Sequence, residues 1–462
     1  MAAQGKEIPR RPAVGEETEV DVVDLNHDGE GVARTRDGFV LFVPEALPGE
    51  RARVLMTRVR PRYGEARLLG VLETTPERVQ PACPAAGVCG GCALQHWEYA
   101  AQAAWKEEAV RQALKRIAGL ERVPVLPILA MERPFGYRNK AQYPVGLRDG
   151  RVVVGFYRRR SHEIVPTDDC LIQHPLAVAV ARAARDGLEK LGISVYDEAT
   201  HTGFARHLVV RVSFSREEVM AILVTRERAF PQAEAWVDEL RHRVPGLVSV
   251  VQNINPARTN VIMGEESLVL WGKDHLVESL GRRQFIISPN SFFQVNPVQA
   301  RRLYELVAEY AELCPGDVLW DVYCGTGSIG IYVAGDGVRL RGVERVAAAV
   351  EDARQNARRN GLEDARFEVG TAEEVLPRWM NEEERADVVV LDPPRSGCDA
   401  VTLDAVVACE PRRIVYVSCN PATLARDLAH LTGKGYRVVK VQPVDMFPHT
   451  PHVECVALVT RA

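Results

Sequence analysis

Several features that would narrow the class of this 462-residue chain are missing from its sequence. Met1 to Arg11 contain no apolar signal core, and no apolar run approaches the ~18 residues that span a membrane. The net charge of -4 shows no large excess of one sign, so any nucleic-acid surface must be a local patch. Internal repeats and low-complexity tracts are absent as well. We therefore expect a cytoplasmic, globular protein of roughly two to four domains, without a membrane or an obligate protein partner.

Ten cysteines are spread unevenly along the chain, which favours metal ligation and catalysis in a reducing compartment over a disulfide framework. Three of them form the pattern Cys83-x5-Cys89-Gly-Gly-Cys92, which can turn tightly around one soft cation or cluster. A fourth thiolate would complete such a site, and Cys170 is the next cysteine along the chain. Zinc and an iron-sulfur cluster both accept four thiolates, so the spacing leaves both open.

The first domain is expected after a loose polar tail, residues 1–16. Residues 17–77 contain short alternating segments, 19–23, 38–43 and 51–55, separated by glycine and proline, as is typical of a small β-barrel. Six arginines between Arg51 and Arg67 face Glu65 as their one acid, which indicates a basic strip suited to phosphates. A solvated charged strand would give the same pattern.

Residues 78–291 are predicted to form an α+β central domain. An amphipathic helix is expected over residues 98–120, closed by Gly119, and further helices over 176–191 and 230–243. Between Arg133 and Arg160, basic residues alternate with aromatic ones, which is typical of single-stranded RNA recognition. The alternative is an amphipathic sheet whose aromatic side chains face the core.

Residues 292–462 are predicted to form an α/β domain. Apolar strands over 318–320, 388–391 and 414–417 are separated by helices such as 347–360, which Gly361 caps. This order indicates a doubly wound parallel sheet. The last two strands, 436–441 and 452–459, are joined by too few residues for a crossover helix, so they should pair antiparallel at one edge.

A glycine loop, residues 321–330, follows the first strand of that sheet and fits G-x-G-x-x-G, a pattern that dinucleotide enzymes share. Glu344 follows the next strand and could bind ribose hydroxyls with either cofactor. Asp321 favours S-adenosylmethionine, because a carboxylate opposes its positive charge and would repel a pyrophosphate. Arg395 in Asp392-Pro-Pro-Arg stands where amino-group methyltransferases usually place an aromatic residue, which argues against nitrogen as the methyl acceptor.

Cys419 follows the apolar run 413–417 at the predicted carboxyl edge of the sheet, and it is the candidate nucleophile. Methylation of C5 of uracil needs a thiolate that adds at C6 and a base that removes the C5 proton. Glu454 is the candidate base. Cys324 is a rival nucleophile, and His449 and His452 are rival bases. The alternative to a catalytic role is that Cys419 is a buried structural cysteine and that Glu454 is an exposed carboxylate on a strand.

Six motifs together closely resemble the RNA uracil-5-methyltransferases that act on 23S ribosomal RNA: SCNP at 418–421, DPPRSG at 392–397, DVYCGTGS at 321–328, SFFQVN at 291–296, HVE at 452–454 and the C-x5-CGGC pattern. The resemblance implies an N-terminal TRAM barrel that binds RNA, a central domain with a [4Fe-4S] cluster and a Rossmann-like methyltransferase domain. It assigns the cluster to Cys83, Cys89, Cys92 and Cys170.

The same resemblance implies roles for single residues. Cys419 matches the nucleophile and Glu454 the general base. The residues that match contacts to S-adenosylmethionine are Gln294, Tyr323, Glu344 and Asp392, and Phe292 matches an aromatic residue near the flipped base. The bacterial tRNA-specific relatives lack the cluster and the barrel, so 23S ribosomal RNA is the expected substrate and tRNA the second.

Two other classes of protein remain open at this stage. One is a nicotinamide-dependent oxidoreductase with an accessory iron-sulfur cluster, which the glycine loop allows. The other is a non-catalytic RNA chaperone built on the barrel and the basic segment. Affinity for S-adenosylmethionine separates both from a methyltransferase.

Overall fold

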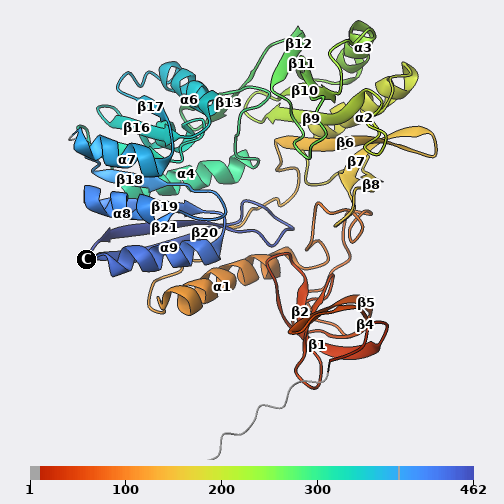
Figure 1. Ribbon diagram of the computed structural model, residues 1–462, viewed down its shortest axis with the longest axis horizontal. Coiled ribbons are helices and arrows are strands. Elements are labelled where there is room, and N and C mark those ends of the chain that lie inside the picture. The colour runs from red at the N-terminus through yellow and green to blue at the C-terminus, as the bar shows by residue number, and fades with distance from the viewer. Residues whose placement is uncertain (1–10, 383–384) are drawn as a thin grey trace, which may run out of the picture. The chain divides into compact units, whose positions relative to one another are not determined.

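The computed structural model describes residues 11–382 and 385–462, which divide into two compact units (Figure 1). The first unit contains the described residues up to Trp105 together with Arg158–Arg160 and Phe447–His452. The second contains Lys106–Tyr157, Ser161–Met446 and Val453–Ala462. No helix within the described ranges has the length and apolar character needed to cross a bilayer.

The first unit is built on a closed barrel of five strands in the order β1-β2-β3-β5-β4. Its strands are β1 (Glu17–Leu25), β2 (Gly31–Arg34), β3 (Val40–Val43), β4 (Arg51–Val59) and β5 (Tyr63–Glu73). Alternate side chains such as Val20, Leu41 and Val54 point inward and form one apolar core. The expected barrel is therefore confirmed, with two more strands than the three segments identified in the sequence.

The end of the predicted tail is ordered on this barrel. Pro12 is buried, and the Gly15 amide donates to the Met56 carbonyl at 2.9 Å. Residues 1–10, the rest of that predicted tail, lie outside the described residues. The first described residues therefore extend the barrel.

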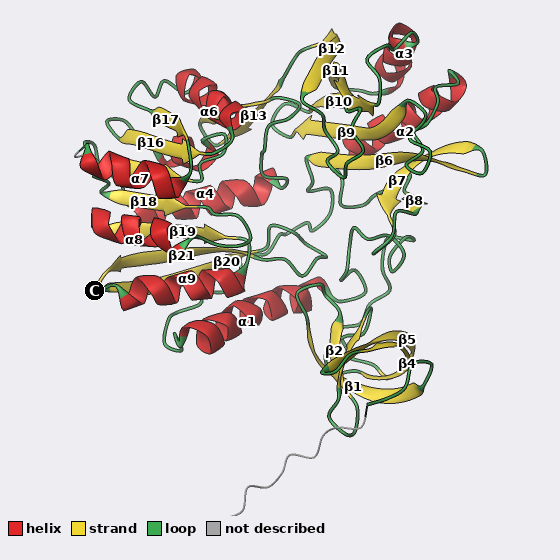
Figure 2. Ribbon diagram, viewed as in Figure 1, coloured by secondary structure: helices red, strands yellow, loops and turns green. Residues whose placement is uncertain are grey.

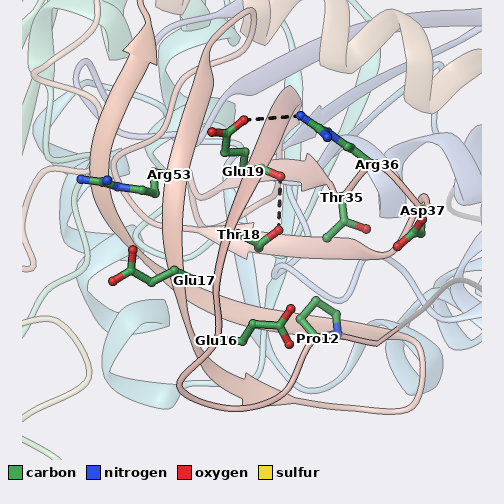
Figure 3. A pocket seen from close by; sticks show the side chains of 9 residues that line it. All are labelled: Pro12, Glu16, Glu17, Thr18, Glu19, Thr35, Arg36, Asp37 and Arg53. Carbon is green, nitrogen blue, oxygen red and sulfur yellow. Dashed lines mark hydrogen bonds and ion pairs between the residues drawn. The ribbon is translucent and has the colours of Figure 1, made fainter.

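The basic strip of the barrel contains fewer unneutralised arginines than the sequence indicates. Arg51 forms ion pairs with Glu19 of β1 at 2.5 Å and with Glu73 at 3.4 Å. Arg53 lines a hollow together with Glu17 and Glu19 (Figure 3). Strand pairing brings these acids beside the arginines from distant parts of the chain, so the prediction that Glu65 is the one acid facing the strip was wrong.

The second unit contains a seven-stranded sheet in the order β12-β11-β10-β9-β6-β7-β8. Its helices, α2 (Pro175–Lys190) and α3 (Ala233–Arg243), pack against the sheet through one apolar cluster that includes Ala184, Leu188 and Trp236. The strands are β6 (Lys140–Arg148), β7 (Arg151–Tyr157), β8 (Ile164–Pro166), β9 (Ala205–Ser213), β10 (Glu218–Thr225), β11 (Leu247–Ile254) and β12 (Glu266–Gly272). A separate hairpin follows, β13 (Leu276–Leu280) with β14 (Arg283–Ile287).

The basic and aromatic segment 133–160 forms much of β6 and β7. Tyr143 is buried and packs against Phe156 with ring centroids 4.9 Å apart, and both belong to the core under α2. Tyr137 is buried as well. The aromatic side chains of this segment therefore serve largely as core, which favours the amphipathic-sheet alternative over a stacking surface for RNA.

The other sheet of this unit has seven strands in the order β17-β16-β15-β18-β19-β21-β20, with helices on both faces (Figure 2). Its strands are β15 (Val318–Val322), β16 (Arg339–Glu344), β17 (Arg366–Val369), β18 (Val388–Leu391), β19 (Arg413–Ser418), β20 (Tyr436–Val444) and β21 (Glu454–Arg461). The first five strands pair parallel, and β21 pairs antiparallel with β19 and β20. The doubly wound sheet and its antiparallel edge are thus confirmed.

The helices of this region are α1 (Tyr99–Ala118), α4 (Pro297–Ala311), α5 (Ser328–Val333), α6 (Ala347–Arg359), α7 (Ala372–Asn381), α8 (Ala400–Cys409) and α9 (Pro421–Gly433). The boundary between the two units falls within α1. Residues of α7, α8 and α9 share one core with β15, β18 and β19, including Trp320, Leu376 and Leu424.

The strand order reverses between β15 and β18. The chain passes from β15 to β16 and β17 on one side, and then returns to β18 on the other. In open parallel sheets, ligands bind at the carboxyl ends of the strands at such a switch point. A ligand site is therefore expected at the residues that follow β15, β18 and β19.

Candidate active site

Two carboxylates lie at the switch point. Asp321 is near the end of β15, and Asp392 directly follows the neighbouring strand β18, where its amide donates to the Val322 carbonyl at 3.3 Å. Asp321 is buried, and its Oδ2 accepts a hydrogen bond from the Gly330 amide at 2.9 Å. Burial raises the pKa of each carboxylate to about 7, and the charge of Asp392 adds to the shift of Asp321.

Close packing against Asp321 explains why position 330 of the G-x-G-x-x-G pattern is a glycine. A Cβ at this position would lie 2.6 Å from Asp321 Oδ2, so a side chain would displace the carboxylate. Asp321 Oδ1 has no hydrogen-bond partner within the described residues. A buried acceptor that the chain leaves unsatisfied is a place where a bound ligand can donate.

Glu344 ends β16 and turns toward the glycine loop. Its Oε2 accepts from the Gly325 amide at 3.3 Å and its Oε1 from the Val346 amide at 2.9 Å. Beside it, the apolar side chains of Val346 and Val369 are exposed at the ends of neighbouring elements. A carboxylate between exposed apolar groups suits a nucleoside, whose ribose is polar and whose base is flat and apolar. The sequence reading missed both valines.

Tyr323 adopts a left-handed backbone conformation, with φ 66°. Only a few per cent of residues other than glycine do so, and such residues concentrate at functional sites. Its hydroxyl donates to Thr402 Oγ1 of α8 at 3.4 Å, and the side chain is half-buried. The ring is thereby presented beside the glycine loop.

The Ser-Cys-Asn-Pro motif ends β19 and starts α9. Asn420 is the N-cap of α9 and accepts from the Ala422 amide at 3.0 Å, while Pro421 occupies the first helical turn. Ser418 Oγ accepts from the Asn420 amide at 3.1 Å. These bonds are local, so the motif forms a tight strand-to-helix turn that presents Cys419 at the sheet edge.

Cys419 and Glu454 lie at the adjoining ends of two paired strands. Cys419 directly follows β19, and Glu454 is the first residue of β21. Ser418 pairs with Cys455, so the next pair of this antiparallel register is Cys419 with Glu454. Burial raises the pKa of Glu454 to about 8, with a further contribution from Asp392. Burial, Glu454 and Asp392 raise the pKa of the Cys419 thiol to about 11, while Arg395 lowers it. A thiol, two carboxylates and a guanidinium thus share one electrostatic site.

The loop that carries Asp392 and Arg395 is held by α9. Asn420 Nδ2 and Thr423 Oγ1 both donate to the Arg395 carbonyl, at 3.1 and 3.3 Å. Further along the loop, the Cys398 amide donates to Asp427 Oδ2 at 2.8 Å. The sequence reading missed Asp427, because nothing in the composition of a helix shows which loop it holds.

The rival nucleophile and bases are differently placed. Cys324 is buried, and a Cβ at Gly342 would lie 3.0 Å from its sulfur, so its thiol packs against β16. Burial raises its pKa well above the usual range of a thiol. His449 and His452 belong to the first unit, where His449 Nδ1 lies 3.4 Å from Gln102 Nε2. Cys324 is thus a buried thiol beside β16, whereas Cys419 directly follows β19 and is half-buried.

The segment Ser291–Asn296 leads into α4. Asn139 Nδ2 donates to the Gln294 carbonyl at 3.0 Å, and the Asn139 amide donates to the Val295 carbonyl at 2.8 Å, so the residue directly before β6 tethers the segment. Phe292 is 64% exposed, and its carbonyl accepts from Thr326 Oγ1 of the glycine loop at 3.4 Å. Phe292 is therefore an apolar ring open to solvent beside the loop.

The cysteines of the predicted cluster are half-buried. Cys83, Cys89 and Cys92 belong to the first unit and Cys170 to the second. The Gly91 amide donates to Cys89 Sγ at 3.4 Å, and burial raises the pKa of Cys89. Among the residues that the structure describes, no group of three or more His, Cys, Asp or Glu side chains is arranged to hold a metal ion.

Comparison with known families identifies two regions of the chain. Residues 264–462 match the family model described as tRNA (Uracil-5-)-methyltransferase. Residues 11–69, which include most of the five-stranded barrel, match the TRAM domain. The first match contains Asp321, Glu344, Asp392, Cys419 and Glu454, whereas Asn139 and the cysteines of the predicted cluster lie outside it.

Relatives extend the match to the whole chain. Uncharacterized RNA methyltransferases of Halalkalibacterium halodurans and Oceanobacillus iheyensis are 46% and 47% identical, and each alignment covers 95% of this chain and at least 95% of the relative. Among solved structures, Pyrococcus abyssi tRNA (uracil-54, C5)-methyltransferase in complex with S-adenosyl-L-homocysteine is 32% identical. It matches with a TM-score of 0.76 over 96% of this chain and 99% of its own.

Proposed function

The chain belongs to the RNA uracil-5-methyltransferase family, and from this premise we propose that it forms 5-methyluridine in RNA, with Cys419 as nucleophile and Glu454 as general base. The observation that carries the proposal is the placement of a half-buried thiol directly after β19 and a buried carboxylate at the start of β21, next to the Ser418–Cys455 pair of the two strands and close enough for Glu454 to raise the pKa of the thiol. Membership of a methyltransferase family argues against the two alternatives, an oxidoreductase and an RNA chaperone without catalytic activity.

The reaction needs both groups in sequence. The Cys419 thiolate adds to C6 of uracil, which makes C5 nucleophilic, and a methyl group is then transferred to C5. The Glu454 carboxylate takes the proton from C5, and the C6–S bond breaks to release the thiolate. Arg395 favours the thiolate, and the raised pKa of Glu454, about 8, suits a base that works near neutral pH.

S-adenosylmethionine, when bound, supplies the methyl group. The residues that we propose to hold it are Gln294, Tyr323, Glu344 and Asp392, together with Asp321. The unsatisfied buried Oδ1 of Asp321 and the exposed apolar groups beside Glu344 support this assignment, because they suit an ammonium group and a nucleoside. Phe292 is proposed to contact the target base once it has left the RNA stack.

Two variants test the mechanism. Cys419→Ala should abolish both methyl transfer and the covalent adduct with RNA that contains 5-fluorouracil. An adduct that persists in this variant would move the nucleophile to Cys324. Glu454→Gln should instead accumulate a covalent protein–RNA intermediate, visible as a retarded band after denaturing electrophoresis. Normal turnover by Glu454→Gln would reassign the base to a histidine.

We propose 23S ribosomal RNA as the substrate and tRNA as the second candidate. The family description and the Pyrococcus abyssi relative both name tRNA, and that relative aligns with the barrel included, so the barrel alone does not separate the two. Labelled methyl transfer to separate pools of unmodified 23S ribosomal RNA and tRNA decides between them. Label in 5-methyluridine from tRNA alone would keep the mechanism and discard the ribosomal substrate.

A [4Fe-4S] cluster on Cys83, Cys89, Cys92 and Cys170 is proposed from the resemblance to the 23S ribosomal RNA uracil-5-methyltransferases, because the cysteine spacing alone leaves zinc open as well. Since the described residues show no preformed metal group, no step of the reaction is assigned to it. Protein purified without oxygen should contain about four iron and four sulfide per chain, and Cys89→Ser should lose them. Iron-free protein with a bound zinc ion would replace the cluster by a zinc site.

A further inference from the structure

Helix α4 links the parts of the active site. It packs on β18 and β19, which Asp392 and Cys419 directly follow, on β21, which begins with Glu454, and on α5, whose first residues belong to the glycine loop. Tyr304, in the middle of α4, is 0% exposed, and its hydroxyl lies 2.9 Å from Ser328 Oγ. Ser328 is the first residue of α5. One partly buried hydrogen bond therefore ties the helix that packs on the catalytic strands to the end of the glycine loop.

The Tyr304 hydroxyl also lies within the field of the carboxylates. Asp392, Asp321 and Glu454 all raise its pKa, in addition to burial, while the bond to Ser328 lowers it. The phenol therefore stays neutral at physiological pH. A neutral hydroxyl can keep its hydrogen bond with Ser328 among negative charges, where a further anion would be repelled.

We propose that Tyr304 is a positioning residue, which holds Ser328 and the glycine loop against the strands of Asp392, Cys419 and Glu454. This inference rests on the proposed function, because it concerns binding of S-adenosylmethionine at that loop. Glycine at 325 and 327, both with positive φ, makes the loop intrinsically mobile, so a fixed point at its end restricts its freedom. Ring packing against Tyr332, with centroids 5.4 Å apart, fixes the phenol in turn.

The same helix offers a matched control. Tyr310 is also buried on α4, but its hydroxyl has no hydrogen-bond partner within the described residues. Its ring packs under the ammonium group of Lys440, at 4.1 Å, which a phenylalanine ring would keep. Tyr304→Phe and Tyr310→Phe therefore remove the same atom from one helix, and only the first removes a bond to α5.

The test is a double-mutant cycle on the full-length protein with S-adenosyl-L-homocysteine as the probe. Tyr304→Phe and Ser328→Ala should each weaken binding about tenfold, and the double variant should bind little worse than either single one. Tyr310→Phe should bind like the wild type. Isothermal titration gives the affinities, and melting curves of all four variants report on the fold.

Each other outcome overturns the inference. Unchanged affinity in Tyr304→Phe, or equal losses in Tyr304→Phe and Tyr310→Phe, would reduce Tyr304 to a packing residue. Multiplying losses in the double variant would show that Tyr304 and Ser328 act independently. Wild-type protein that fails to bind S-adenosyl-L-homocysteine would instead refute the proposed function, so the two failures can be told apart.

Discussion

Three carboxylates with raised pKa values lie at the edge of one sheet. Burial raises the pKa of Asp321 and Asp392 to about 7 and that of Glu454 to about 8. In the unfolded chain these groups would ionise near their ordinary values, so at neutral pH the fold holds them at a cost in stability. Such a cost is typical of groups kept for binding and catalysis.

Glu454→Gln should therefore stabilise the protein in a pH-dependent way. The pKa of Glu454 rises from an ordinary value of 4.5 to about 8 on folding. Below pH 4.5 both states are protonated, and as pH rises toward 8 the unfolded state ionises first, so wild-type stability falls through that window. Glutamine does not ionise, so the variant should not lose stability over this pH range through position 454.

Melting curves across pH check this expectation. The melting temperature of Glu454→Gln should exceed that of the wild type by a few degrees at pH 8, and the difference should vanish toward pH 4.5. A gain that stays constant with pH would show that ionisation of Glu454 is not its cause.

The element that orders the catalytic edge is the turn from β19 into α9. Asn420 caps α9, and its amide group also donates to the Arg395 carbonyl at 3.1 Å, so one side chain fixes the helix start and the loop that follows β18. Asp399 caps α8 by the same pattern, accepting from the Val401 amide at 2.8 Å. No hydrogen bond joins the Asp399 side chain to the Arg395 backbone within the described chain.

Asn420→Ala should therefore damage activity more than Asp399→Ala at a similar loss of stability. Each variant loses one helix cap, which costs about 1 kcal/mol in the free energy of unfolding. Only Asn420→Ala releases the loop of Arg395, and we expect a fall in kcat of at least about tenfold, because Arg395 favours the thiolate of Cys419. Denaturant unfolding and methyl-transfer rates measure the two effects separately, and equal activity in both variants would contradict the role of Asn420 beyond capping.

Much of this edge could be predicted from the sequence, because its signals are local. The apolar run before Cys419, the Asn-Pro break and the short link between the last two strands each act within a few residues. The partners of these groups could not be predicted. Asp427 and Tyr304 reach the site from helices, and Asn139 from the residue before a strand, and the sequence pattern of these segments indicates burial but not what lies opposite.

The segment 133–160 shows the same limit in reverse. Its alternation of basic and aromatic residues is interpreted as an RNA-stacking surface, with an amphipathic sheet as the alternative, because the pattern does not reveal which face another element covers. Helix α2 covers the face of Tyr143 and Phe156, which turns an expected stacking surface into core. The alternative of an amphipathic sheet therefore describes this segment better, and the packing of α2 that decides between the two could not be predicted from the segment itself.

At the scale of the whole molecule, a chain with a net charge of -4 must bind a polyanion through a local surface. Arg62 and Arg67 of the barrel are exposed and make no ion pair within the described residues, whereas Arg51 is neutralised by Glu19 and Glu73. Free cations that meet phosphates release counterions, and paired ones do not. Substitution of Arg62 and Arg67 therefore tests whether the barrel binds RNA phosphates, and substitution of Arg51 is the control.

The double variant Arg62→Ala/Arg67→Ala should weaken RNA binding, and the slope of log affinity against log salt concentration should fall by about 1 to 2. Arg51→Ala removes a positive charge from the same barrel but should leave the slope unchanged, because its charge is already paired. Binding of S-adenosyl-L-homocysteine should be unaffected in both variants, since the proposed cofactor residues belong to the other unit. An equal change of slope in Arg51→Ala would mean that net charge, and not the free arginines, attracts the RNA.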